Sequence, residues 1–220
     1  MPLLQPFTLA ARESLSVLVL GCHSDDIEIG CGATLLGIAQ RHPHAEVTWA
    51  VLSAEGERRD EATASAQAFT EGTARLDLRL ESFRDGYFPY HGAAVKDWFE
   101  DLKSSVEPDV VFTHHGQDRH QDHRLVAELT WNTFRRHLIL EYEVPKYDGD
   151  LGSPNVFVPL DEEVVAKKME LLRRQFASQS SRHWFDEEVF RALLRLRGME
   201  AAPPTRYAEA FYGRKLALAP

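Results

Sequence analysis

The sequence predicts an α/β protein with a Rossmann-like three-layer fold, whose mostly parallel sheet has strand order 3-2-1-4-5 plus extra C-terminal strands. Short apolar runs rich in β-branched residues alternate with segments of helical spacing, which is typical of right-handed crossovers between parallel strands. The runs at 16–21 and 110–113 are apolar almost throughout, as expected for strands buried on both faces. No linker or repeat divides the 220 residues, so we expect residues 1–220 to form one domain.

Apolar spacing marks the elements of the first half in turn. Residues 16–21 form a β-branched run that ends in glycine, and residues 32–40 carry leucine and isoleucine at helical spacing. A strand at 46–52 precedes a helix at 58–70 that is rich in alanine and charge. Residues 76–80 alternate leucine with charged residues, which indicates a shorter strand.

The next elements lie around a proline. Pro108 ends a helix expected at 94–106, because proline does not continue a helix, and a buried strand follows at 110–113. A helix at 120–136 and a strand at 137–142 come next.

The C-terminal part departs from this alternation. The segment 144–159 is rich in proline and glycine, and we expect it to cover the site or to cross back over the sheet. Helices are expected at 162–176 and 186–197, and a closing strand at 207–212. The closing strand would extend the sheet beyond its first five strands.

Composition and charge exclude several classes of protein. Hydrophobic residues make up 44% and charged residues 27%, which is ordinary for a soluble globular protein. The net charge of −9 and the lack of a basic run argue against a nucleic-acid partner or an anionic membrane surface. Nothing approaches a membrane span, and residues 1–14 lack a long apolar stretch, so we expect no integral membrane segment and cytoplasmic residence.

Two short stretches carry the candidate chemistry. Residues 22–32, Cys-His-Ser-Asp-Asp-Ile-Glu-Ile-Gly-Cys-Gly, follow the first strand, and residues 120–123, His-Gln-Asp-His, follow the fourth. In the order 3-2-1-4-5 these strands are neighbours where the winding reverses, and ligands bind in the crevice at that point. We therefore expect the two stretches to face each other. Their imidazoles and carboxylates suit a divalent metal site with a spare carboxylate for acid–base chemistry.

Individual roles follow from this arrangement. His123 can reach inward as a metal ligand, with His23 supplying a second nitrogen and Asp26 an oxygen. Three protein ligands and a water form the open arrangement of catalytic zinc, which lowers the pKa of the bound water. Asp25 is expected to act as general base, because adjacent carboxylates at a turn cannot both point the same way. His120 shares a helix face with His123 and is expected to stabilise the developing oxyanion.

Each stretch taken alone has a plainer interpretation. An Asp-Asp pair is usually a solvated turn, and a His-x-x-His pair on a helix often lies on the surface. Joint occurrence after two buried strands favours the metal site. Cys22 and Cys31 are expected to pack rather than to bind metal, and without Cys-x-x-Cys spacing they predict neither a disulfide scaffold nor a zinc knuckle. One of His114 and His115 is expected to face the crevice, in a structural or a substrate-contacting role.

The two motifs resemble those of the PIG-L/LmbE-like family of zinc-dependent N-deacetylases. The family's first motif, His-Pro-Asp-Asp-x-Glu-x-Gly-x-Gly-Gly, is matched by residues 23–33, with Ser24 in place of proline and Ala33 in place of glycine. Its His-x-Asp-His motif is matched by residues 120–123. Weaker matches are the Arg-x-x-Glu start of a helix, the Asp-Gly of a loop, and a late stretch; they lie at 58–61, 85–86 and 207–211.

The resemblance implies that zinc is bound by His23, Asp26 and His123. It also implies that Asp25 is the general base and that His120 is the oxyanion-stabilising or acid residue. It adds Asp122 as a residue that orients a histidine. Arg58 and Asp85 become tentative substrate contacts, although Arg58 and Arg59 suit a salt-bridged helix start equally well. The implied substrate is a small N-acetylglucosamine-like sugar conjugate, which loses its acetyl group by hydrolysis.

Other functions are kept as alternatives. One is a metal-dependent hydrolase of another amide or an ester. Another is a dinucleotide-binding Rossmann module, but the glycines at 21, 30 and 32 do not form Gly-x-Gly-x-x-Gly, and carboxylates would occupy the pyrophosphate position. A non-catalytic, metal-stabilised scaffold leaves Asp25 without a role. Zinc is the expected cofactor, another divalent metal is possible, and oligomerisation is left open.

Overall fold

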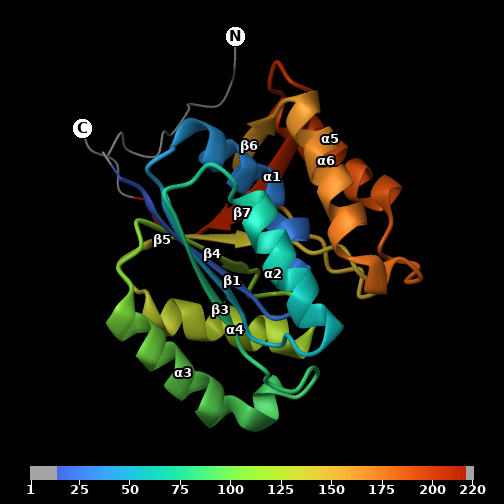
Figure 1. The fold of residues 1–220 in the computed structure, drawn as a ribbon. Helices are drawn as coiled ribbons and strands as arrows, with labels where there is room; N and C mark the ends of the chain where they lie inside the picture. Colours follow the sequence, from blue (N-terminus) through green and yellow to red (C-terminus); the bar gives the residue numbers. More distant parts are fainter. Residues whose placement is uncertain (1–13, 217–220) are drawn as a thin grey trace.

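The computed structural model describes residues 14–216 (Figure 1), so the expectation for the N-terminal stretch before Ser14 lies outside the described residues. A seven-stranded sheet has the order β3-β2-β1-β4-β5-β7-β6. The predicted α/β fold and the order 3-2-1-4-5 with extra C-terminal strands are therefore confirmed. The strands are β1 Ser16–Gly21, β2 Glu46–Val51, β3 Arg75–Leu80, β4 Val110–His114, β5 Leu138–Tyr142, β6 Val156–Leu160 and β7 Tyr207–Gly213.

Helices cover both faces of this sheet. They are α1 Asp26–Arg41, α2 Glu57–Phe69, α3 Gly92–Ser105, α4 Gln121–Thr133, α5 Glu162–Gln175 and α6 Glu187–Ala201, with short 3₁₀ turns η1 Phe88–His91 and η2 Ala177–Gln179. In Figure 1, α3 and α4 lie on one face, and α1, α2, α5 and α6 lie on the other. No helix within residues 14–216 is long and apolar enough to cross a membrane.

The alternating side chains of β1 separate two apolar cores. Val17 and Val19 point into the core formed with α1, α2, α5 and α6. Leu18 and Leu20 point into the core formed with α3 and α4. Since successive residues of a strand face opposite sides, one strand that is apolar on both faces supports both layers.

The winding reverses between β1 and β4. These two strands pair in parallel, with Val17 opposite Val110 and Val19 opposite Phe112. Helix α1 follows β1 and helix α4 follows β4, so both motifs emerge at the same carboxyl edge of the sheet. The topology thus brings together residues that are about a hundred positions apart.

One local expectation was wrong, and the position of one C-terminal strand was not predicted. Helix α1 begins at Asp26 rather than at Gly32, so the first motif is itself helical. Residues 156–160 form strand β6, which pairs antiparallel with β7. Pro159 argues against a central strand, but β6 is at the edge of the sheet, where a proline needs no ladder partner on its outer side.

Candidate metal centre and active site

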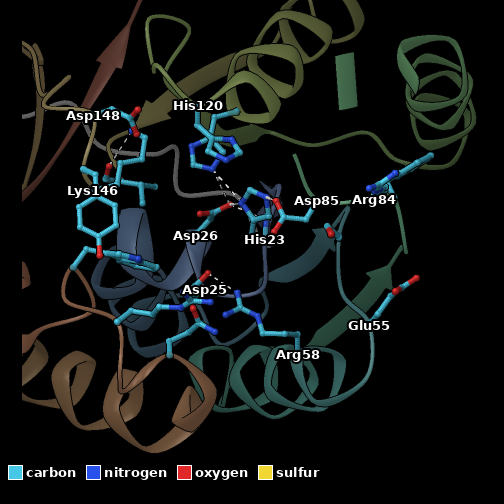
Figure 2. Close-up of a pocket in the computed structure, with 18 of the residues that line it drawn as sticks. His23, Asp25, Asp26, Glu55, Arg58, Arg84, Asp85, His120, Lys146 and Asp148 are labelled. Atoms are coloured by element: carbon cyan, nitrogen blue, oxygen red, sulfur yellow. Dashed lines mark hydrogen bonds and ion pairs between the residues drawn. The ribbon is translucent and has the colours of Figure 1, made fainter. Parts of the chain in front are cut away.

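A cavity of about 630 Å³ opens at the carboxyl edge of β1 and β4 (Figure 2). Its walls come from both motifs, the loop at 82–85, the segment 144–148 and the turn at 179–184. Every predicted site residue lines it except Asp122, which is buried behind it. The expectation that the 144–159 segment covers the site is confirmed for its first residues.

Three donor atoms meet at the inner end of the cavity. The distance from His23 Nδ1 to Asp26 Oδ2 is 3.2 Å, from His23 Nδ1 to His123 Nε2 3.3 Å, and from His123 Nε2 to Asp26 Oδ2 3.4 Å. Donors bound tetrahedrally to zinc at about 2.0–2.1 Å lie about 3.3–3.4 Å from one another. The spacing of these three atoms therefore fits one metal ion.

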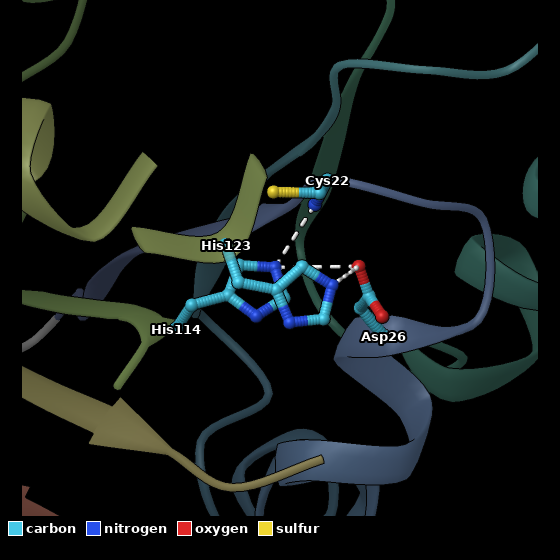
Figure 3. Close-up of side chains that lie close together, drawn as sticks. All are labelled: Cys22, Asp26, His114 and His123. Carbon is cyan, nitrogen blue, oxygen red and sulfur yellow. Dashed lines mark hydrogen bonds and ion pairs between the residues drawn. The ribbon is translucent and has the colours of Figure 1, made fainter. Parts of the chain in front are cut away.

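The surroundings of this triangle offer further donors. Two groups of side chains have ligand atoms within 4.8 Å of one another: Cys22, Asp26, His114 and His123 (Figure 3), and His23, His120 and Asp122. The three atoms of the triangle come from both groups. Hydrogen bonds and burial distinguish ligands from supports among the remaining side chains.

His114 supports the triangle from within the protein. Its Nε2 lies 3.3 Å from Asp26 Oδ2 but accepts the peptide N–H of Cys22 at 3.0 Å, and this bond occupies its lone pair. Its ring stacks on that of His123 at 3.8 Å. Burial, with the charge of His123, lowers the pKa of His114 to about 4. His114 is thus an uncharged side chain that packs against the candidate ligands.

Cys22 and His115 have other surroundings. Cys22 is fully buried in the core formed with α3 and α4, and this burial raises the pKa of its thiol, which opposes the thiolate form that binds metals. His115 points away from the cavity. Its Nδ1 lies 2.7 Å from Glu141 Oε2, and its ring stacks on that of Tyr212.

The charges of the cluster depend on one another. Burial raises the pKa of Asp26, but the charges of His123 and His23 outweigh burial and hold it well below its usual range. Burial lowers the pKa of His123, but Asp26 and Asp118 outweigh burial and raise it. Asp26 is consequently anionic near neutral pH, as a metal ligand must be.

Asp118 holds His123 from behind. Its Oδ2 lies 2.9 Å from His123 Nδ1, on the side of the ring opposite the triangle. Its Oδ1 accepts the His120 peptide N–H at 2.7 Å and lies 3.0 Å from Lys146 Nζ. A carboxylate on the second ring nitrogen fixes the tautomer of a ligating histidine and raises its basicity.

Asp25 is buried beside the triangle and lines the cavity. Its Oδ1 accepts from Arg58 Nη2 at 2.8 Å (Figure 2). Its Oδ2 is buried and has no hydrogen-bond partner among the described residues. Burial raises the pKa of Asp25 despite the opposing charge of Arg58. One oxygen is thus held in place while the other is available for a proton.

His120 and the loop at 85–88 complete the site. The His120 ring lies 5.0 Å from that of His23, and no residue of the described chain bonds its buried Nδ1. Burial and two neighbouring imidazoles lower its pKa. Asp85 Oδ1 lies 3.0 Å from His23 Nε2, so Asp85 contacts a candidate ligand as well as lining the cavity.

Asp122 lies 3.7 Å from His23 Nε2, and its two oxygens accept the peptide N–H groups of Gly86 and Phe88 at 2.7 and 3.1 Å. It therefore ties the 85–88 loop to α4. Arg59 has a similar structural contact, because it donates to the Leu80 carbonyl at 3.1 Å.

The family model described as PIG-L: GlcNAc-PI de-N-acetylase matches residues 18–134, which are more than half of the chain and contain both motifs. The chain belongs to the PIG-L family. The resemblance inferred from the two motifs is thus confirmed, and the matched segment includes the candidate ligands, Asp25, Arg58 and Asp118.

Individual relatives span most of this PIG-L chain. The Escherichia coli K12 protein YaiS, described as an uncharacterized deacetylase, is 28% identical over 173 residues, covering 75% of this chain and 92% of YaiS. The N,N′-diacetylchitobiose deacetylase of Pyrococcus horikoshii is 20% identical with a TM-score of 0.65, covering 90% and 83% of the two chains. GalB of Pseudomonas putida KT2440, a 4-carboxy-2-hydroxymuconate hydratase, is 18% identical with a TM-score of 0.74, covering 94% and 98%. These two structures show a shared fold.

Sequence reasoning missed two supports of this PIG-L site. It expected Asp122 to orient a histidine, and the Asp122 carboxylate lies 3.7 Å from the second nitrogen of His23; it did not name Asp118, which holds the second nitrogen of His123. It also left open the role of His114, which contacts Asp26 and His123. A usable signal for Asp118 was its position two residues before the His-x-Asp-His motif, since ligating histidines almost always have such a partner.

Proposed function

We propose that this PIG-L protein is a zinc-dependent hydrolase that removes the acetyl group from an N-acetylated amino-sugar conjugate. The observation that carries the proposal is the triangle of His23 Nδ1, Asp26 Oδ2 and His123 Nε2, at 3.2–3.4 Å, beside the unpartnered Oδ2 of Asp25. These three residues would hold the metal. When bound, zinc supplies Lewis acidity toward a carbonyl oxygen and lowers the pKa of a water molecule.

The residues around the triangle account for the proton transfers. Asp25 Oδ2 accepts a proton from the attacking water, while Arg58 keeps Oδ1 fixed and so directs the free oxygen. The oxygen of that water forms the new bond to the acetyl carbon, and the bond from that carbon to the sugar nitrogen breaks. Asp25 then returns the proton to the departing nitrogen, so the products are an amine and acetic acid, which ionises to acetate.

His120 is placed to interact with the carbonyl oxygen of the substrate. Its ring lines the cavity, 4.5 Å from the ring of His123. A hydrogen bond from this imidazole to the oxygen would be strongest when negative charge develops there, which lowers the barrier. His120 thus has a role distinct from that of Asp25.

The cavity supports a sugar conjugate as substrate. Its volume of about 630 Å³ falls in the range for small-molecule sites, about 300–1,000 Å³. Arg58, Arg84 and Arg182 offer hydrogen-bond donors on its walls, and Trp184 and Tyr147 offer aromatic faces. The Pyrococcus deacetylase named above acts on an N-acetylated disaccharide, in keeping with this substrate class.

The test combines metal analysis with amine release. We expect the purified protein to contain one zinc per chain and to release free amine from a panel of N-acetylglucosamine conjugates, with the activity lost on chelation and regained on adding zinc. O-acetylated sugars and 4-carboxy-2-hydroxymuconate serve as comparison substrates. If the protein hydrolyses only the O-acetyl esters, or only adds water to the muconate, that activity replaces deacetylation as its function. A protein that binds no divalent metal would overturn the proposal.

A further inference from the structure

A buried ion pair lies beneath helix α1, outside the cavity. Lys168 of α5 and Glu209 of β7 are 1% and 2% exposed, and Lys168 Nζ lies 2.7 Å from Glu209 Oε1. Neither side chain lines the cavity. Burying two charges is costly unless the pair is fully hydrogen-bonded.

The remaining bonds of the pair go to the backbone of α1. Glu209 accepts the N–H groups of Ala33 and Thr34 at 2.9 and 2.6 Å, and Lys168 donates to the Ile29 carbonyl at 2.7 Å. In a regular α-helix the Ala33 N–H donates to the Ile29 carbonyl. The ion pair thus bonds both the donor and the acceptor of one backbone hydrogen-bond position of α1, the Ala33 N–H and the Ile29 carbonyl. These bonds tie α1 to α5 and β7.

An aromatic ring also fixes the same helical turn. A Cβ atom on Gly30 would lie 2.1 Å from Cδ2 of Tyr142, so the helix backbone packs directly on that ring. The Tyr142 hydroxyl donates to the Leu20 carbonyl of β1 at 2.6 Å. The second turn of α1 is therefore held by both the Tyr142 ring and the ion pair.

This turn is close to the candidate metal ligand of α1. Ile29 is three residues beyond Asp26, which is about 4.5 Å along the helix axis. His123, by contrast, belongs to α4 on the other face of the sheet. The gap between Asp26 Oδ2 and His123 Nε2 depends on where α1 lies along and about its axis.

We propose that Lys168 and Glu209 are positioning residues for the metal centre, which set the place of Asp26 relative to His123 by holding the second turn of α1. The inference rests on the proposed metal-dependent function. Neither Lys168 nor Glu209 contacts the site. The proposal gives a role to Lys168 and to Glu209, which belongs to the weaker family match at 207–211.

The test measures metal affinity apart from catalysis. In K168M/E209M, which removes both charges together, we expect Kd for Zn²⁺ and Co²⁺, measured by competition with a chromophoric chelator, to rise about 10- to 100-fold. The visible spectrum of the Co²⁺ form should change, because the ligand geometry changes. The conservative K168R variant keeps the charge and should bind metal more tightly than K168M.

M169A is the matched control, because Met169 is a buried neighbour on α5 that lines a separate pocket with Phe185 and Phe190. It should lower Tm while leaving metal Kd within about twofold of the wild-type value, and a similar loss of affinity in M169A would reduce the effect to general stability. Wild-type affinity and an unchanged Co²⁺ spectrum in K168M/E209M would overturn the positioning role alone. Failure of the wild-type protein to bind metal would instead overturn the proposed function. If K168M/E209M does not fold, K168R and E209Q decide the question by the same two readouts.

Discussion

Replacing Gly30 with alanine tests whether α1 is seated directly on the ring of Tyr142. The added Cβ would lie 2.1, 2.6 and 2.8 Å from three atoms of that ring. Carbon atoms in favourable contact are about 3.5–4.0 Å apart, so the ring or the helix must move by more than 1 Å, roughly. The ring is itself held by the bond from its hydroxyl to Leu20, so little of this movement is free.

The size of the effect follows from two opposing contributions. Overpacking a core costs typically about 1–3 kcal/mol, and three contacts this short place G30A toward the upper end. Alanine gains about 0.8–1.0 kcal/mol over glycine in a helix. The expected net loss is about 1–2 kcal/mol in the free energy of unfolding, which lowers Tm by about 2–8 °C in a chain of this length.

Gly37 offers a control in the same helix. A Cβ there meets only the guanidinium of Arg41, 3.1 Å away at the far end of a flexible side chain. G37A should therefore gain part of the helix-propensity term and unfold at or above the wild-type temperature. Equilibrium urea unfolding with chelator present would measure both variants without a contribution from bound metal. A G30A protein as stable as G37A would refute the close packing of α1 on Tyr142.

Four further predictions concern the centre itself. D25N should lose at least about 10²-fold in turnover, since the general base is removed, yet keep wild-type metal content by elemental analysis; loss of metal would instead make Asp25 a ligand. H123A should lose both metal and turnover, and D118N should weaken metal binding about 10- to 100-fold in a chelator competition, because His123 loses its charged partner. An unchanged Kd in D118N would contradict that role. For protein kept in free metal at 100 times the metal Kd, adding a chelator should remove about 2.7 kcal/mol from the free energy of unfolding and lower Tm by about 5–11 °C. An unshifted Tm would argue against metal at the triangle.

The overall topology could be predicted from the sequence, because a strand that is buried on both faces consists almost entirely of apolar residues. Residues 16–21 and 110–113 are continuously apolar, and their central place in the sheet follows from that. The position of the two motifs then follows from strand order alone. The start of α1 was missed because glycines at 30 and 32 weaken a helical pattern, whereas in the fold their lack of a side chain lets Tyr142 and Phe69 approach.

The supports of the site were harder to predict, because nothing local marks them. Asp118 lies in an irregular loop, and only the folded chain shows that this carboxylate reaches the second nitrogen of His123. Lys168 and Glu209 lie in segments that alternate apolar and charged residues, which predicts exposure for charged side chains. Their burial depends on three elements meeting, which spacing within any one of them does not reveal.

The bond between Lys146 and Asp118 has a consequence for the evolution of new specificities. Segment 144–148 lines the cavity, yet Lys146 from this segment lies 3.0 Å from the Asp118 carboxylate and 2.7 Å from that of Asp150. A loop exchanged to admit a different substrate would alter the carboxylate that supports His123 as well. If the triangle holds a metal as proposed, Lys146 couples substrate range to metal retention in this protein, and a graft of this loop would have to keep the lysine to change one without the other.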